Sequence, residues 1–171
     1  MKKLGYVWCA VMMLSFIGTA QAALDFDFSG TFTKDNDIAL LNFTVGSTST
    51  VTVFSSSWVE GNTTGVPVHG FDPILAIWDS SGNLIEQQDD GGFSGQESSN
   101  GTLYDVGTWD SYYQVLLGPG TYTASIAQFD NFAAGSNLSD GFIHDSDPHF
   151  TTGWGPQADF NGVWDQPNDA R

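Results

Sequence analysis

Residues 117–128 read LGPGTYTASIAQ, and this stretch decides the fold class of the chain. Gly118-Pro119-Gly120 predicts a tight turn, because glycine reaches backbone angles closed to other residues and proline presets one of them. The residues that follow alternate between two faces of a strand: Tyr122, Ala124 and Ile126 on one, Thr123, Ser125 and Ala127 on the other. A turn leading into a period of two predicts an antiparallel strand pair.

The same pattern recurs along the chain, and helical periodicity is almost absent. We expect strands near residues 26–32, 39–45, 50–53, 74–78, 84–85, 112–117 and 121–128, and loops at 56–70 and 89–101. From residue 130 onward the strand pattern thins into Asn, Gly, Ser and Asp. The prediction is an all-β fold: an antiparallel β-sandwich or jelly-roll-like single domain with a long loop-rich C-terminal segment. Phe43 and Ile126 are expected in its core.

The first 22 residues have the composition of a Sec-type signal peptide. Lys2 and Lys3 precede an apolar run over residues 4–17, and residues 18–22 end in the small-residue pattern Ala-Gln-Ala. The run is shorter than the roughly 20 residues that a bilayer span needs, and no second such run follows. We therefore predict cleavage after Ala22, a secreted or envelope-associated domain over residues 23–171, and no membrane span in it. Cys9 leaves with the leader, so no disulfide is expected.

The charge of the chain is extreme. Its 20 acidic residues outnumber 4 Lys and Arg, giving a formal net charge of −16. Because phosphate binding needs clusters of Lys and Arg, nucleic acid and anionic membrane surfaces are excluded as partners. Two explanations of the acidity stay open: solubility outside the cell, and carboxylates that hold divalent cations.

Several short motifs, in their order and spacing, resemble a known module. They are Gly30 with Phe32, then residues 37–43 (DIALLNF), 71–75 (FDPIL), 78–82 (WDSSG), 89–91 (DDG) and 117–122 (LGPGTY). Over roughly residues 26–165 they resemble the bacterial pre-peptidase C-terminal domain. With residues 110–114 (DSYYQ), they resemble more closely a family of secreted bacterial proteins named for a Phe-Asp-Pro motif, many of which carry a PEP-CTERM sorting tail.

This resemblance implies a β-sandwich and a location outside the cell, in bacteria that produce exopolysaccharide, but it implies no reaction. No protease domain precedes the module in this sequence, and residues 168–171 (NDAR) show no sorting tail. Relatives tend to continue into one more apolar strand. Whether a last strand and a C-terminal sorting tail are missing from this domain therefore stays open.

Four aspartates are candidate calcium ligands: Asp72, Asp89, Asp90 and Asp110. Each lies at a predicted strand end or in a loop, and strand ends gather at the same edge of a sandwich. Calcium prefers several carboxylate and carbonyl oxygens held by such loops. The alternative is that these side chains only accept backbone hydrogen bonds in turns. Asp35-Asn36-Asp37 is a weaker pattern, because it lacks the glycine and distal glutamate of an EF-hand loop.

Other chemistry finds little support. His144 and His149 lie near acids, but Pro148 prevents a regular helix that would align them, so a solvated loop is favoured. The sequence has no Gly-x-Ser-x-Gly elbow, and His69 has no recognisable serine partner. We therefore predict that the protein is not an enzyme. Four tryptophans lie in or beside predicted loops and are candidates for stacking on sugar rings: Trp58, Trp109, Trp154 and Trp164.

The sequence thus predicts a secreted, non-catalytic β-sandwich of the cell envelope or extracellular matrix, with Ca2+ as the expected cofactor and polysaccharide or envelope components as the expected partners. Two alternatives stay open. One is a self-associating structural surface protein without a small ligand, and the other is a hydrolase whose site has no recognisable motif.

Overall fold

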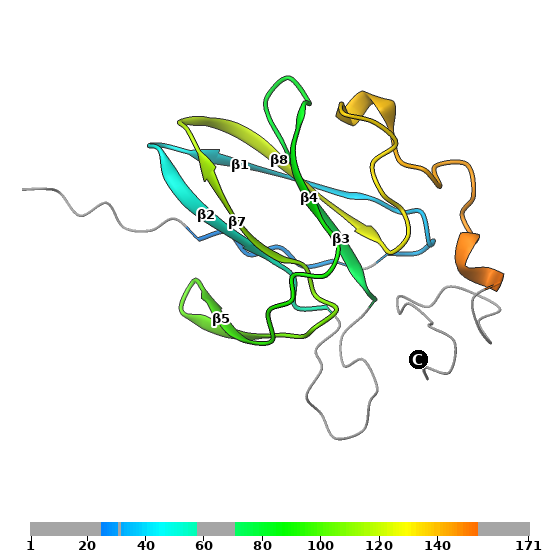
Figure 1. Cartoon of the computed structure of the whole chain (residues 1–171), viewed down its shortest axis with the longest axis horizontal. Helices are drawn as coiled ribbons and strands as arrows, with labels where there is room; N and C mark the ends of the chain where they lie inside the picture. The colour runs from blue at the N-terminus through cyan, green and yellow to red at the C-terminus, as the bar shows by residue number, and fades with distance from the viewer. Residues whose placement is uncertain (1–24, 31, 58–70, 154–171) are drawn as a thin grey trace, which may run out of the picture.

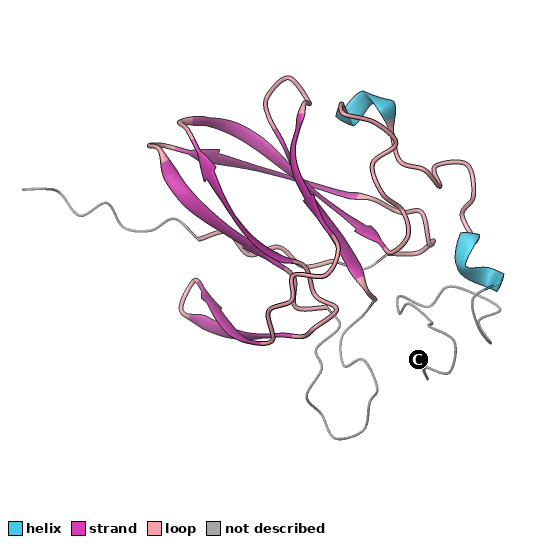
Figure 2. Cartoon of the chain, viewed as in Figure 1, coloured by secondary structure: helices cyan, strands magenta, loops and turns pink. Residues whose placement is uncertain are grey.

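The computed structural model describes residues 25–30, 32–57 and 71–153. Its elements, in chain order, are β1 (Ala39–Val45), β2 (Ser49–Phe54), β3 (Pro73–Trp78), β4 (Leu84–Gln88), β5 (Gly95–Ser99), β6 (Thr102–Val106), β7 (Tyr112–Leu117), β8 (Gly120–Gln128) and two short 3-10 helices, Leu138–Asp140 and Phe150–Gly153. Strands dominate the described chain, which confirms the all-β prediction (Figure 2).

Two antiparallel sheets form the sandwich (Figure 1). The larger sheet has four strands in the order β1-β8-β3-β4, and the smaller sheet pairs β2 with β7. The hairpin of β5 and β6 forms a separate two-stranded sheet at one end. The turn at 118–120 joins β7 of the smaller sheet to β8 of the larger sheet, so the predicted turn carries the chain from one layer to the other.

The core lies between these two sheets. Phe43 from β1, Ile77 from β3 and Leu117 from β7 belong to one buried cluster. Ile126 packs against this cluster from β8, together with Tyr122, while Ala124 lies inside it. The alternation predicted for residues 121–128 is therefore confirmed, and both residues expected in the core lie on the inner face.

The opposite face of the larger sheet is covered as well. Every residue of β3 is buried, so this strand is enclosed on both faces. On the outer side, the indole Nε1 of Trp78 donates to the Ser125 hydroxyl at 2.8 Å, and Phe142 meets the Trp78 ring edge-on at 6.3 Å. Residues 129–153 therefore form a second layer, built from turns, two isolated bridges and the two short 3-10 helices. The loop-rich C-terminal segment is part of the packed structure.

Two predicted boundaries are wrong. The described residues of 26–32 form no strand: Asp25 and Asp27 accept hydrogen bonds from Asn100 instead of joining a ladder. Residues 89–101 are only partly loop, because β5 begins at Gly95 and turns into β6 through Asn100 and Gly101. Both turn residues have positive φ, 48° and 75°, which is the requirement of a two-residue hairpin turn.

The predicted signal peptide lies outside the described residues, as do Trp58, His69, Trp154 and Trp164. Among the described residues, no helix has the length and apolar character needed to cross a membrane.

Candidate metal centre

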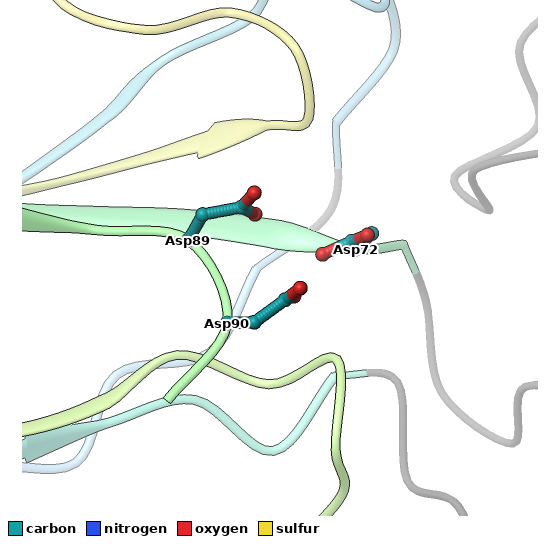
Figure 3. Close-up of side chains that lie close together, drawn as sticks. All are labelled: Asp72, Asp89 and Asp90. Atoms are coloured by element: carbon teal, nitrogen blue, oxygen red, sulfur yellow. The ribbon is translucent and has the colours of Figure 1, made fainter. Parts of the chain in front are cut away.

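Three of the four predicted calcium ligands meet at one end of the larger sheet. Asp72 immediately precedes β3, and Asp89 and Asp90 immediately follow β4. Because β3 and β4 are antiparallel neighbours, the start of one lies beside the end of the other. One carboxylate oxygen from each aspartate lies within 4.8 Å of the others (Figure 3).

The three carboxylates differ in burial. Asp72 is 1% exposed, Asp89 is half-buried and Asp90 is exposed. The buried Oδ1 atoms of Asp72 and Asp89 have no hydrogen-bond partner. The Asp72 main chain is fixed, since its carbonyl accepts a bond from the Phe129 N–H at 2.8 Å. Buried carboxylate oxygens without a donor are costly, so this cluster differs from an ordinary turn of hydrogen-bonded acids.

Burial and the crowding of negative charge raise two pKa values at this site. Burial, reinforced by the charges of Asp89, Asp90 and Asp110, raises the pKa of Asp72 from 3.8 to about 9. Burial and the charges of Asp90 and Asp130 raise the pKa of Asp89 to about 7. The carboxylates can therefore be stabilised in two ways: by taking up protons, or by sharing a cation that compensates their negative charge.

Asp110, the fourth candidate, lies outside the three-carboxylate group. Its Oδ1 accepts hydrogen bonds from the Ser55 hydroxyl at 2.8 Å and the Ser57 N–H at 2.7 Å, and its Oδ2 accepts one from the Gly107 N–H at 2.9 Å. The side chain is fully buried. The charge of Asp110 raises the pKa of Asp72, but its own oxygens accept hydrogen bonds from the loops at this end of the sandwich.

Gly91 and Ser111 were not among the predicted site residues, yet both contact the chain segments that carry the aspartates. A Cβ at position 91 would collide with the backbone of Tyr112, so only glycine lets the loop after Asp90 approach β7 this closely. The Gly91 N–H donates to the Asp110 carbonyl at 3.1 Å. The glycine that follows the paired aspartates was a visible signal in the sequence. The structure explains why glycine is needed there: it contacts Tyr112, 21 positions further along the chain.

Comparison of the chain with protein-family models, curated proteins and solved structures finds no match. The resemblance to Phe-Asp-Pro proteins and to the pre-peptidase C-terminal domain therefore stays a prediction.

The remaining candidates have structural contacts. The His144 ring stacks on Phe150 at 3.9 Å, with its Nε2 3.9 Å from a carboxylate oxygen of Asp130. Asp35, in the weaker calcium pattern, is buried and accepts two hydrogen bonds from Thr151, through its N–H at 2.9 Å and its hydroxyl at 2.6 Å. Trp109 is half-buried and is the only one of the four candidate tryptophans within the described residues.

Proposed function

We propose that this protein is an exported, non-catalytic β-sandwich that binds a calcium ion between Asp72, Asp89 and Asp90. The observation that carries the proposal is the buried Asp72 carboxylate. Its Oδ1 has no hydrogen-bond partner, and one oxygen of Asp72 lies within 4.8 Å of a carboxylate oxygen of Asp89 and of one of Asp90. Calcium lies about 2.3–2.6 Å from its oxygen ligands, so oxygens that share one ion are at most about 5 Å apart. The cluster meets this limit.

The donor atoms favour calcium over transition metals. The group contains carboxylates and no histidine or cysteine, and hard cations prefer oxygen. The ligands also come from a strand end and an adjoining loop, which suits the irregular coordination of calcium better than the strict octahedron of magnesium. An ion here would offset the burial and the repulsion that together raise the pKa of Asp72 and Asp89.

Calcium should stabilise the folded protein beyond the effect of ionic strength. An ion that binds only the folded state adds about 2.7 kcal/mol at a hundredfold excess over its Kd. Melting temperatures should therefore rise more in calcium chloride than in sodium chloride of matched ionic strength, and EDTA should reverse the rise. Asp72→Asn and Asp90→Asn should each remove the calcium-specific increment, because each removes a ligand charge.

The matched control is Asp105→Asn. Asp105 is an exposed aspartate whose carboxylate accepts a bond from Gln96 at 2.8 Å, outside the cluster. This variant should keep the full calcium increment. Equal stabilisation of the wild type by sodium and calcium would refute the ion, and would leave solubility as the explanation of the acidity.

Polysaccharide is the partner class that we propose for the site. Asp90 is exposed, so an ion bound beside it would face solvent and could accept hydroxyl oxygens of a saccharide in its open positions. Selective binding on a glycan array in calcium, abolished by EDTA and by Asp90→Asn, is the expected result. Glycan binding that does not depend on calcium would show that glycan recognition does not need the ion. The absence of glycan binding, together with oligomers that form as the protein concentration rises, would favour the self-associating alternative.

A further inference from the structure

We propose that Ser111 is the residue that positions the aspartates of the cation site. This proposal rests on the proposed calcium function. The Ser111 side chain is fully buried. The hydroxyl oxygen lies 2.7 Å from the Pro73 carbonyl, 3.0 Å from the Gln88 carbonyl and 2.6 Å from the Asp89 carbonyl. These carbonyls belong to Asp89 itself and to residues directly beside Asp72 and Asp89.

The hydroxyl stands where the pairing of β3 and β4 stops. Their last paired residues at this end are Leu75 and Gln88, and the ladder does not continue to Pro73 and Asp89. Proline has no N–H to donate to a ladder. The Ser111 hydroxyl carries one proton, which the three nearby carbonyl oxygens share, so it links the two strand ends at a point where the ladder supplies no bond. Asp72 and Asp89 leave these ends, so their separation depends on this contact.

The surroundings of Ser111 hold it in place independently of the ligands. Its N–H donates to the Ser55 hydroxyl at 3.0 Å, and that hydroxyl in turn donates to the preceding residue, Asp110. Gly91 then packs on the backbone of the following residue, Tyr112. Residues 110–112, of which Asp110 and Ser111 are buried, thus support the loop that carries Asp89 and Asp90 at the start of β7.

Calcium titration of the folded full chain tests this role. Ser111→Ala removes no ligand, yet it should weaken calcium binding by about tenfold or more, as the loss of groups behind metal ligands commonly does. The matched control is Ser125→Ala: Ser125 is equally buried and its hydroxyl bonds the Trp78 indole, away from the cluster. This control should lose stability but keep the calcium affinity of the wild type. An unchanged affinity in Ser111→Ala, or an equal loss in Ser125→Ala, would overturn the proposal.

Amide exchange in EDTA measures positioning without calcium. In Ser111→Ala the Gly91 N–H, which bonds the Asp110 carbonyl, should exchange about tenfold faster than in Ser125→Ala, because the loop loses its support. If the wild type binds no calcium, the proposed function fails, while Gly91 exchange still decides the role of Ser111. Equal exchange in the two variants overturns that role.

A third variant covers the case in which Ser111→Ala does not fold. Ser111→Cys keeps the shape of the side chain with a weaker donor. It should fold and still bind calcium more weakly than the wild type. Wild-type affinity in this variant contradicts the proposal.

Discussion

At the residue scale, the protein places a carboxylate where burial and like charge both oppose its ionisation. Asp72 is enclosed just before β3, and within the described part of the chain the charges that act on it are those of Asp89, Asp90 and Asp110. With 4 Lys and Arg in the whole sequence, side-chain cations are scarce. A proton or an external cation must therefore compensate the charge, and the two alternatives have different pH dependence.

Without calcium, stability should fall as pH rises from about 4. Asp72, with a pKa of about 9, and Asp89, with a pKa of about 7, hold protons in the folded state that an unfolded carboxyl of pKa 3.8 has released. Above pH 3.8 the folded state therefore binds more protons than the unfolded state, so the free energy of unfolding decreases as pH rises. The contribution of Asp89 to this decrease ends at about pH 7, and that of Asp72 at about pH 9.

Urea unfolding in EDTA at about pH 5 and about pH 8 measures this decrease. Asp72→Asn should make the dependence shallower, and saturating calcium should reduce it in the wild type by keeping the carboxylates ionised. A wild type that gains stability over this range in EDTA would show that the carboxylates are not crowded as described.

At the element scale, the second layer over residues 129–153 is attached by polar contacts as well as by packing. Asp35, from the turn before β1, reaches Thr151 in the last described helix, 116 positions away. The Pro148 carbonyl accepts a bond from the Asp35 N–H at 3.2 Å. One buried turn residue therefore joins the beginning of the domain to the end of its outer layer.

Asp35→Ala should detach the end of this layer. The substitution removes the carboxylate that accepts two hydrogen bonds from Thr151, and losing such a buried acceptor costs about 1–3 kcal/mol of unfolding free energy. Chemical unfolding gives the loss, and limited proteolysis should cut the variant near residues 145–153. Asp147→Ala should cost less, because the Asp147 carboxylate is exposed and accepts a hydrogen bond from the nearby His149 N–H at 3.2 Å. Equal losses would argue against the tether.

At the scale of the whole molecule, the apolar core between two unequal sheets stabilises the fold together with the outer layer. The smaller sheet supplies only β2 and β7, so each large side chain between the layers carries much of the packing. Phe43 stacks on Tyr122 at 5.7 Å and meets Phe26 at 6.0 Å, linking β1, β8 and the segment before β1.

Phe43→Ala should therefore cost about 3–5 kcal/mol of unfolding free energy, because it leaves a cavity between the sheets. Denaturant unfolding at fixed calcium measures the loss. The control is Leu116→Ala on the solvent side of β7, where the leucine is 70% exposed, and its effect should stay near 0.5 kcal/mol. A loss below that level for Phe43→Ala would place the residue outside the core.

Much of the fold and part of the candidate site could be predicted from the sequence. Six of the strands were predicted: most from period-two alternation, which burying one face of a sheet imposes, and β3 from its continuous apolar run. The same reasoning failed at residues 26–32, where alternating phenylalanines form no strand, and at 95–106, where Asn100-Gly101 was an overlooked hairpin signal. Strand ends also indicated that Asp72, Asp89 and Asp90 would converge.

Only the tertiary structure separated Asp110 from that group. All four aspartates read alike in sequence, but three backbone and hydroxyl donors surround the Asp110 carboxylate, whereas the buried Oδ1 of Asp72 has none. The fit of Gly91 against Tyr112 and the three carbonyls around Ser111 depend on how chain segments far apart in sequence pack. Local patterns determine which residues face inward, because that follows from backbone periodicity. Which buried oxygens find donors is decided by long-range packing, and no local pattern records it.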